Sequence, residues 1–182
     1  MTTLNNMSSL ILRDLIDSRS AQDFGNIFQS LVETAIRLER PALAAQGNAG
    51  NPDFIWMDPA TNHTWGYEVK SSSNPSGVPV SIASRNALGQ QKHKRLVYLD
   101  TSGHPVRLYV CDLSSFLDNN VNQTDPIKVH PKTLQNQWMQ QEEKQLKSEL
   151  ECVIQTMNTA LFDNLPEQQI PTEIKNRLSK VF

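Results

Sequence analysis

The amino-acid sequence predicts an α/β domain, in which a mixed β-sheet is flanked by helices and followed by a helical C-terminal segment. Helical and strand-like patterns follow one another in the order α-α-β-β-α-β-β-α-α, which is typical of such a sheet. The chain has 182 residues, of which 38% are hydrophobic, and a chain of this size can hold a core without disulfides. We expect a single domain over residues 1–182, with its core at about 20–113 and the helical segment at about 132–182.

Two helices are predicted before the first strand. Ser8-Ser9 can cap a short helix from Leu10 to about Asp17. Ser20 begins a second helix with a capping-box arrangement, and a broad apolar face extends this helix to Arg40, where Pro41 stops it.

Strands and helices alternate through the rest of the chain. The expected elements, in order, are a flexible connection (41–51), two strands (53–57 and 65–70) around a turn, a loop (71–79), a helix (80–94), two further strands (95–99 and 106–111), an amphipathic helix around Leu146–Ala160 and a final helix at about 172–181. The helical segment follows a shift in composition to Gln, Glu and Lys past Pro131.

The first two strands predict a hairpin with two chemically different faces. If the turn is centred between residues 60 and 61, directly opposed residues have numbers that sum to 121. Asp53 then faces Glu68, and Lys70 lies on the same face as Glu68. The same register opposes aromatic residues on the other face, Trp56 to Trp65 and Phe54 to Tyr67. We therefore expect one face to pack and the other to hold two carboxylates and an amine.

Two opposed carboxylates repel each other, and a divalent cation relieves that repulsion. Mg²⁺ prefers a few carboxylate oxygens and keeps several waters, which leaves room for a phosphate oxygen and an attacking water. A neighbouring lysine can orient that water. Asp53, Glu68 and Lys70 thus form a minimal set for metal-assisted hydrolysis of a phosphodiester.

The segments Pro52-Asp53 and Glu68-Val69-Lys70 resemble the PD-(D/E)XK nuclease superfamily, which includes most type II restriction endonucleases. The resemblance covers about Ser20 to Leu113 and implies a restriction-endonuclease-like fold. It also implies that Asp53, Glu68 and the backbone carbonyl of Val69 bind Mg²⁺, with Mn²⁺ as the expected substitute, and that Lys70 positions the attacking water.

The superfamily commonly carries a further glutamate on the helix before the hairpin, and the resemblance assigns this role to Glu33. Many members place that acid directly after an apolar residue a few positions beyond a glycine, where this chain has Gln29. An ordinary ion pair between Glu33 and Arg37, four residues on, is the open alternative.

A basic strip is predicted after the hairpin. Five basic residues, Arg85, Lys92, Lys94, Arg95 and Arg107, lie in a region whose one acid is Asp100, giving a local charge of +4. A solvated surface and a strip that contacts phosphates are both open. We name Arg85, Gln91, Lys92, Lys94 and Arg95 as candidate DNA contacts. In the superfamily, the helix after the Glu-x-Lys strand often carries polar residues that reach the active site. The resemblance gives Ser81, Arg85 and Gln91 as candidates for this role.

Other functional classes find little support in the sequence. The net charge of −2 excludes a wholly basic nucleic-acid coat, and no Cys/His spacing suggests zinc. Cys111 and Cys152 lie in apolar patterns and are expected to be reduced and structural. No stretch resembles a membrane span or a secretory signal, so we expect an intracellular protein without a membrane partner. No dinucleotide fingerprint or nucleophile with a partner is present.

These observations predict a Mg²⁺-dependent endonuclease of double-stranded DNA. The resemblance favours a type II restriction enzyme that acts as a homodimer in the cytoplasm of a prokaryotic or phage-infected cell. The alternatives are another nuclease of the superfamily, with a role in repair, at junctions or in a phage or mobile element, and a catalytically silent DNA-binding protein of the same fold. The helix around 146–160 is expected to pack on the core, while dimerisation or a DNA groove is its alternative use.

Overall fold

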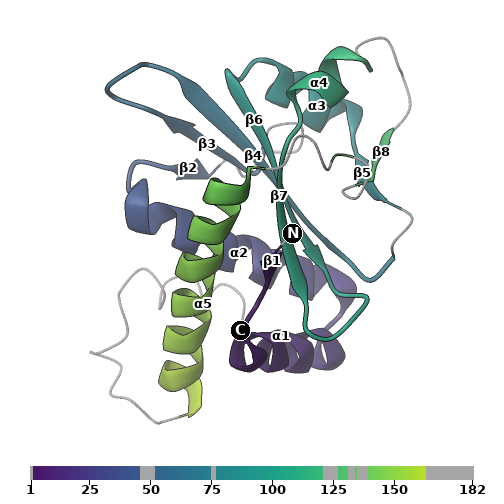
Figure 1. Cartoon of the computed structure of the whole chain (residues 1–182), viewed down its shortest axis with the longest axis vertical. Coiled ribbons are helices and arrows are strands. Elements are labelled where there is room, and N and C mark those ends of the chain that lie inside the picture. The colour runs from purple at the N-terminus through teal and green to yellow at the C-terminus, as the bar shows by residue number, and fades with distance from the viewer. Residues whose placement is uncertain are drawn as a thin grey trace.

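The computed structural model describes residues 2–45, 52–74, 77–120, 127–130, 134 and 139–162, without the side chains of residues 45 and 159–162. It contains a mixed sheet of order β1-β7-β6-β4-β3-β2, with helices packed against it (Figure 1). The strands are β1 (Thr2–Thr3), β2 (Ala44–Ala45), β3 (Phe54–Met57), β4 (Thr64–Ser72), β6 (His93–Asp100) and β7 (Arg107–Asp112). β4 and β6 are parallel and the other neighbours are antiparallel. The predicted mixed α/β sheet with flanking helices is thus confirmed.

Five helices and a small second sheet complete the described part of the chain. The helices are α1 (Asn6–Ser18), α2 (Ala21–Glu39), α3 (Ile82–Gly89), α4 (Ser114–Asp118) and α5 (Gln140–Phe162), and the second sheet pairs β5 (Val78–Val80) with β8 (Ile127–Val129). α5 confirms the amphipathic helix predicted around residues 146–160. The final helix expected at 172–181 lies outside the described residues.

Side-chain caps determine where the first two helices begin. The Ser20 side chain accepts a hydrogen bond from the backbone N–H of Asp23 at 3.1 Å, as the capping-box pattern predicts. The predicted start of the first helix is wrong, because the side chain of Asn5 accepts from the N–H of Ser8 at 2.8 Å and begins α1 four residues earlier. Ser8 and Ser9 are consequently buried inside the helix instead of capping it.

The hairpin has the predicted register. Phe54 lies opposite Tyr67 and Trp56 lies opposite Trp65, so paired numbers sum to 121. Asp58 stabilises the turn, since its side chain accepts from the N–H of Ala60 at 2.9 Å. Because successive side chains of a strand point to opposite faces, odd or even residue number alone assigns each residue of β3 and β4 to a face.

The third predicted helix, at 80–94, is shorter than expected. Ser81 caps α3 by accepting from the N–H of Ser84 at 3.1 Å, and α3 ends at Gly89. Val80 belongs to β5, while His93 begins β6. Glycine disfavours continued helix, and the β-strand pairing that follows needs residues 93 and 94 in extended conformation.

Both faces of the sheet pack against other elements. The face that carries Phe54 and Tyr67 lies in a core shared with α1, α2 and α5. The face that carries Glu68 is covered by a second cluster that includes Leu88 of α3 and Leu117 of α4. The face of Glu68 thus holds the predicted carboxylates and amine, but it is also packed, because α3 and α4 cover it.

The two cysteines lie in different environments. Cys111 belongs to the second cluster and is buried, as predicted, whereas Cys152 is exposed on α5. Both are free thiols. Within the residues described, no helix combines the length and apolar character that crossing a membrane requires.

Candidate active site

Asp53 lies at a bend directly before β3, one residue beyond the β3–β4 ladder. Its Oδ2 accepts a hydrogen bond from the N–H of Val69 at 2.7 Å and lies 4.0 Å from the Nζ of Lys70. Burial raises the pKa of Asp53, and the charge of Lys70 and the bond from Val69 oppose this rise. The side chain is thus held at the edge of β4 by the backbone of the residue next to Glu68.

Glu68 lies in the middle of β4 with only 2% of its surface exposed. Its Oε1 lies 2.6 Å from the Nζ of Lys70. Its Oε2 is buried and has no hydrogen-bond partner among the described residues. Burial raises the pKa of Glu68; Lys70 opposes this, Asp53 adds to it, and the Ser84 hydroxyl of α3 lowers it to a smaller degree.

The three residues predicted to carry the chemistry therefore meet around one point, the Nζ of Lys70. An ammonium group is the only cation that the described part of the chain places between these two carboxylates. It satisfies one oxygen of Glu68, while Oε2 makes no hydrogen bond in the described residues and the Ser84 hydroxyl acts on this carboxylate only weakly. This is an expensive arrangement for a buried acid. The cluster thus has unused capacity for positive charge.

The oxygen atoms of Asp53 and Glu68 near the Nζ of Lys70 are ligands that suit a hard divalent ion. No group of three or more His, Cys, Asp or Glu side chains that could hold a metal occurs among the described residues. A bound ion would have Asp53 and Glu68 as carboxylate ligands, together with backbone oxygen and water, the mixture that Mg²⁺ accepts. In an extended strand the N–H and C=O of one residue point to the same edge. Because the N–H of Val69 binds Asp53, its carbonyl faces the edge where Asp53 lies.

Glu33 forms the ion pair that the sequence offered as an alternative. It is buried on α2, and its Oε1 lies 3.0 Å from both Nε and Nη2 of Arg37. Gln29, one turn earlier, is half-buried on the same helix. A role for Glu33 at the acidic cluster stays a prediction.

Two of the candidate DNA contacts are buried, so the idea of an exposed strip is wrong for them. Arg95 is 3% exposed, and its guanidinium binds Asp112 at 2.8 Å and Glu142 through Nε and Nη2 at 2.8 and 3.1 Å. Arg85 is 7% exposed and donates to the carbonyl of Asn120 at 3.2 Å. These arginines join β6 to α5 and α3 to the end of α4.

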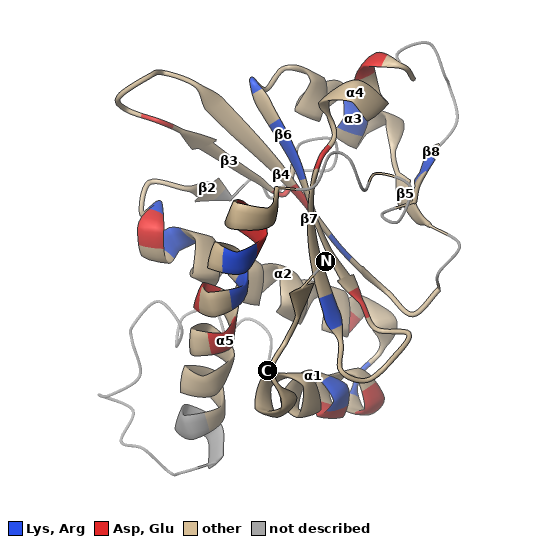
Figure 2. Ribbon diagram, viewed as in Figure 1, with Lys and Arg blue, Asp and Glu red and all other residues tan. Residues whose placement is uncertain are grey.

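The other candidate contacts lie nearer the surface. Lys92 is exposed, while Lys94 and Gln91 are half-buried. Gln91 packs against Gly66, where an added Cβ would lie 2.7 Å from the Gln91 Cγ. Lys94 alternates with Arg95 and so lies on the same face of the sheet as Glu68. Figure 2 shows the basic residues at the start of β6 beside the strand that carries the acidic cluster.

The sequence analysis missed Ser84. It predicted Ser81, which is exposed and caps α3, whereas the residue whose hydroxyl acts on Glu68 is Ser84. The cap was the available signal, because Ser84 follows the capping residue Ser81 by three positions and the two hydroxyls lie 3.0 Å apart.

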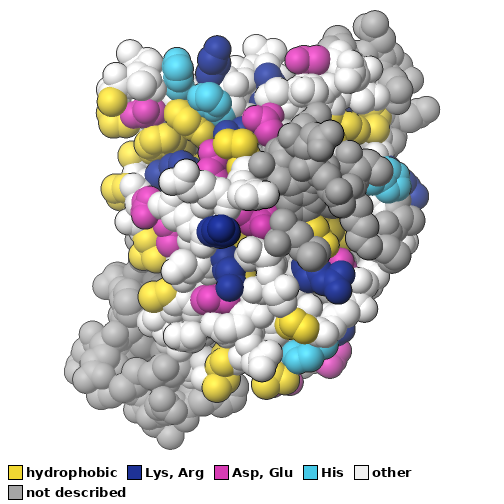
Figure 3. All heavy atoms as spheres, in the orientation of Figure 1, with side chains coloured by type: hydrophobic (Ala, Val, Ile, Leu, Met, Phe, Trp, Pro, Cys, Tyr) yellow, Lys and Arg dark blue, Asp and Glu magenta, His cyan; other side chains and the backbone are white. Residues whose placement is uncertain are grey.

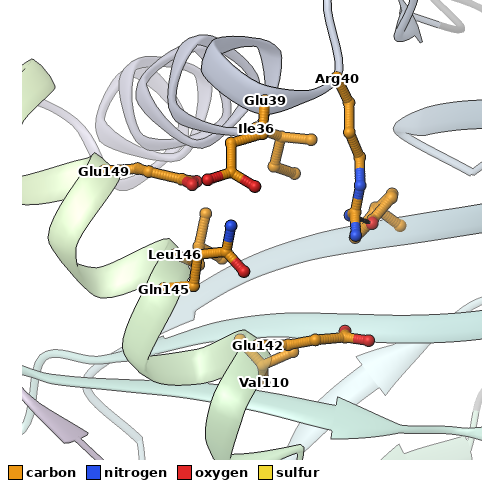
Figure 4. A pocket seen from close by; sticks show the side chains of 9 residues that line it. Ile36, Glu39, Arg40, Val110, Glu142, Gln145, Leu146 and Glu149 are labelled. Atoms are coloured by element: carbon orange, nitrogen blue, oxygen red, sulfur yellow. Dashed lines mark hydrogen bonds between the residues drawn. The ribbon is translucent and has the colours of Figure 1, made fainter.

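A second carboxylate pair lines a pocket on the opposite face of the sheet, between α2 and α5. Figure 4 shows the carboxylates of Glu39 and Glu149 pointing toward one another, with Gln145 and Arg40 nearby. Burial and the neighbouring Glu39 raise the pKa of Glu149 to about 7. One Glu149 oxygen is buried without a hydrogen-bond partner in the described residues. The sequence analysis did not predict this pair.

Known proteins give no further guide to this site, since no protein-family model, curated protein or solved structure matches the chain.

Proposed function

We propose that this protein is a metal-dependent nuclease that hydrolyses phosphodiester bonds of DNA at the cluster formed by Asp53, Glu68 and Lys70. The observation that carries the proposal is the convergence of both carboxylates on one lysine, with a buried Glu68 oxygen that has no partner in the described residues. Asp53 and Glu68 would hold Mg²⁺, or Mn²⁺ as a substitute, and the carbonyl of Val69 would add a backbone ligand. When bound, the ion would supply positive charge to a phosphate oxygen and acidify a water.

Lys70 has a separate role in this proposal. Its side chain is 32% exposed, and its ammonium lies near both Asp53 and Glu68. From that place it can donate hydrogen bonds to a water that attacks phosphorus, or to oxygens that gain charge in the transition state.

The substrate that we favour is double-stranded DNA, cut by a homodimer of the type II restriction class. The resemblance of Pro52-Asp53 and Glu68-Val69-Lys70 to the PD-(D/E)XK nucleases supports this choice. Lys92 and Lys94 are the candidate contacts that lie close enough to the surface to bind phosphates. The second candidate is another nuclease of that superfamily or a silent DNA-binding relative.

The test is incubation of plasmid and phage DNA with the purified chain, with and without Mg²⁺ or Mn²⁺. Discrete fragments that need the metal support a restriction enzyme. A smear or nicked circles support a nuclease of another role. Binding without cleavage supports a silent relative, and neither binding nor cleavage contradicts the proposal.

A further inference from the structure

The rings of His63, Trp65 and His93 gather at the end of the sheet where the β3–β4 turn lies. His63 directly precedes β4, and His93 begins β6. Because Trp65 lies beside His93 in the parallel β4–β6 pair, and residues two apart share a face, His63 is a diagonal neighbour of His93 on that face. Figure 3 shows His side chains next to hydrophobic ones at this end of the molecule.

The two imidazoles are close enough to bind one ion. Their ring centroids lie 5.5 Å apart. With metal–nitrogen bonds of about 2.1 Å, two imidazoles on a tetrahedral ion have centroids roughly 5 Å apart. His63 is exposed and His93 is half-buried, so water can reach the positions that the two rings leave open.

The surroundings of His93 favour the neutral imidazole that a metal ligand needs. Burial, Arg95 and His63 lower the pKa of His93, more than Asp112 and Glu142 raise it. A neutral imidazole keeps a lone pair for a metal. The ring lies 4.1 Å from the Trp65 ring, centroid to centroid, and this contact limits the orientations that His93 can adopt.

We propose that His63 and His93 form a binding site for one borderline transition-metal ion of the Zn²⁺, Ni²⁺ or Cu²⁺ class, with water as the remaining ligands. Imidazole nitrogen favours these ions over Mg²⁺, which prefers oxygen. His63 lies five residues before Glu68, roughly 16 Å along the strand at the usual rise, so this site is separate from the carboxylate cluster. The proposal does not depend on the proposed nuclease activity.

Some charged groups around the two rings attract a bound cation, and others repel it. Asp112 and Glu142 attract it, but both bind Arg95, whose charge repels it. Lys92, adjacent in sequence, is exposed and can turn into solvent. The two imidazoles must therefore supply the binding energy, and removal of either ring should abolish binding.

The test uses the full chain titrated with Ni²⁺, followed by calorimetry and by tryptophan fluorescence. We expect one ion to bind saturably and to quench part of the emission, because Trp65 contacts His93. His63→Gln and His93→Gln should each remove both signals. His104→Gln is the matched control, since His104 is exposed in a loop away from the two rings, and it should bind Ni²⁺ as the unmodified chain does.

Circular dichroism of each variant separates loss of binding from loss of folding, and His63→Gln, at an exposed position, keeps the test decisive if His93→Gln unfolds. Binding that survives His63→Gln would overturn the proposal. Equal weakening by His104→Gln would show an adventitious ion only. Mg²⁺-dependent DNA cleavage should be the same in His63→Gln and the unmodified chain, so this result is distinct from the outcome for the proposed nuclease.

Discussion

The two carboxylate pairs of this molecule offset their repulsion in different ways. Asp53 and Glu68 converge on an ammonium, and Lys70 lies 4.0 Å from one and 2.6 Å from the other. Glu39 and Glu149 face each other across α2 and α5, and the pKa of Glu149 is raised to about 7. The first pair is held by a cation, whereas burial and the repulsion of the second pair favour the protonated form of Glu149. A divalent ion can replace an ammonium without a change in protonation, so the first pair is the one suited to metal chemistry.

The surroundings of the pairs explain the difference. Glu68 is almost fully buried in the middle of a strand, where it can move little. Glu149 is half-buried at the rim of a pocket of about 30 Å³, room for one or two waters. Arg40 is near this pocket but its guanidinium donates to the hydroxyl of Tyr67 and lies 4.8 Å from the centroid of the Trp56 ring. The charge of Arg40 therefore lowers the pKa of Glu149 less than burial and Glu39 raise it.

The largest effect expected is the loss of cleavage in Asp53→Asn. The substitution removes the negative charge that would bind the ion, while an amide oxygen can still accept the hydrogen bond from Val69. We expect no detectable cleavage of plasmid DNA and an unchanged unfolding midpoint. Asp14→Asn, at an exposed position on α1, is the matched control and should cleave normally. Full activity in Asp53→Asn would remove the metal from the proposed mechanism.

A smaller kinetic effect is expected from Lys70→Ala. Loss of a group that acts on the attacking water should lower the single-turnover rate by a factor on the order of 10² or more. Mn²⁺ binding, measured by calorimetry, should survive, because both carboxylates remain. Lys144→Ala on the exposed side of α5 should leave the rate unchanged. A normal rate in Lys70→Ala would make this lysine a purely structural partner of Glu68.

Lys70→Ala should also make the Asp53–Glu68 pair resemble the Glu39–Glu149 pair, in which no lysine among the described residues offsets the repulsion of the carboxylates. Without Lys70, the pKa of Glu68 should rise further, because burial and Asp53 then act unopposed by a cation. Lys70→Ala should therefore lose stability as the pH rises from 5 to 8, by on the order of 1–3 kcal/mol relative to the unmodified chain. Urea unfolding at several pH values measures this. A constant difference across that range would mean that the pair does not share a proton when the lysine is absent.

Local rules predicted the hairpin well but not the partners of the basic residues. The register of β3 and β4 follows from parity, which links Phe54 to Tyr67 once the turn is placed. Arg95 reads as an exposed charge in sequence, yet its partner Glu142 lies 47 residues away on α5. His63 and His93 likewise meet only because β4 and β6 are parallel. Long-range pairings of this kind depend on how the sheet is ordered, which no local spacing encodes.

The cap of the first helix illustrates the same limit at short range. Ser8, Ser9 and Asn5 are all good capping residues, and the choice depends on which backbone enters the core. β1 pairs with β7 through Thr2 and Thr3, and Leu4 is buried directly after them. The chain must therefore turn into the helix at Asn5. That tertiary contact makes Asn5 the N-cap of α1, although the local capping preferences of Ser8 and Ser9 are equally strong.

The smallest effect expected concerns Glu149, and it tests whether the second pair holds a proton. An acid whose pKa is about 7 in the folded chain and near 4.5 when unfolded binds its proton more tightly in the folded state. Its contribution to stability is fully present below pH 4.5 and is lost as the pH rises through 7. Glu149→Gln replaces the protonated acid by a neutral amide that can still donate to Glu39. Because Glu149 is half-exposed, solvent screening reduces the effect, and we expect a gain on the order of 1 kcal/mol at pH 8 and little change at pH 5. Urea unfolding at both pH values measures this gain, and Ser148→Ala, at an exposed position on the same helix, should retain the pH dependence of the unmodified chain. If Glu149→Gln were equally stabilising at pH 5 and pH 8, the gain would come from packing and the pair would not share a proton.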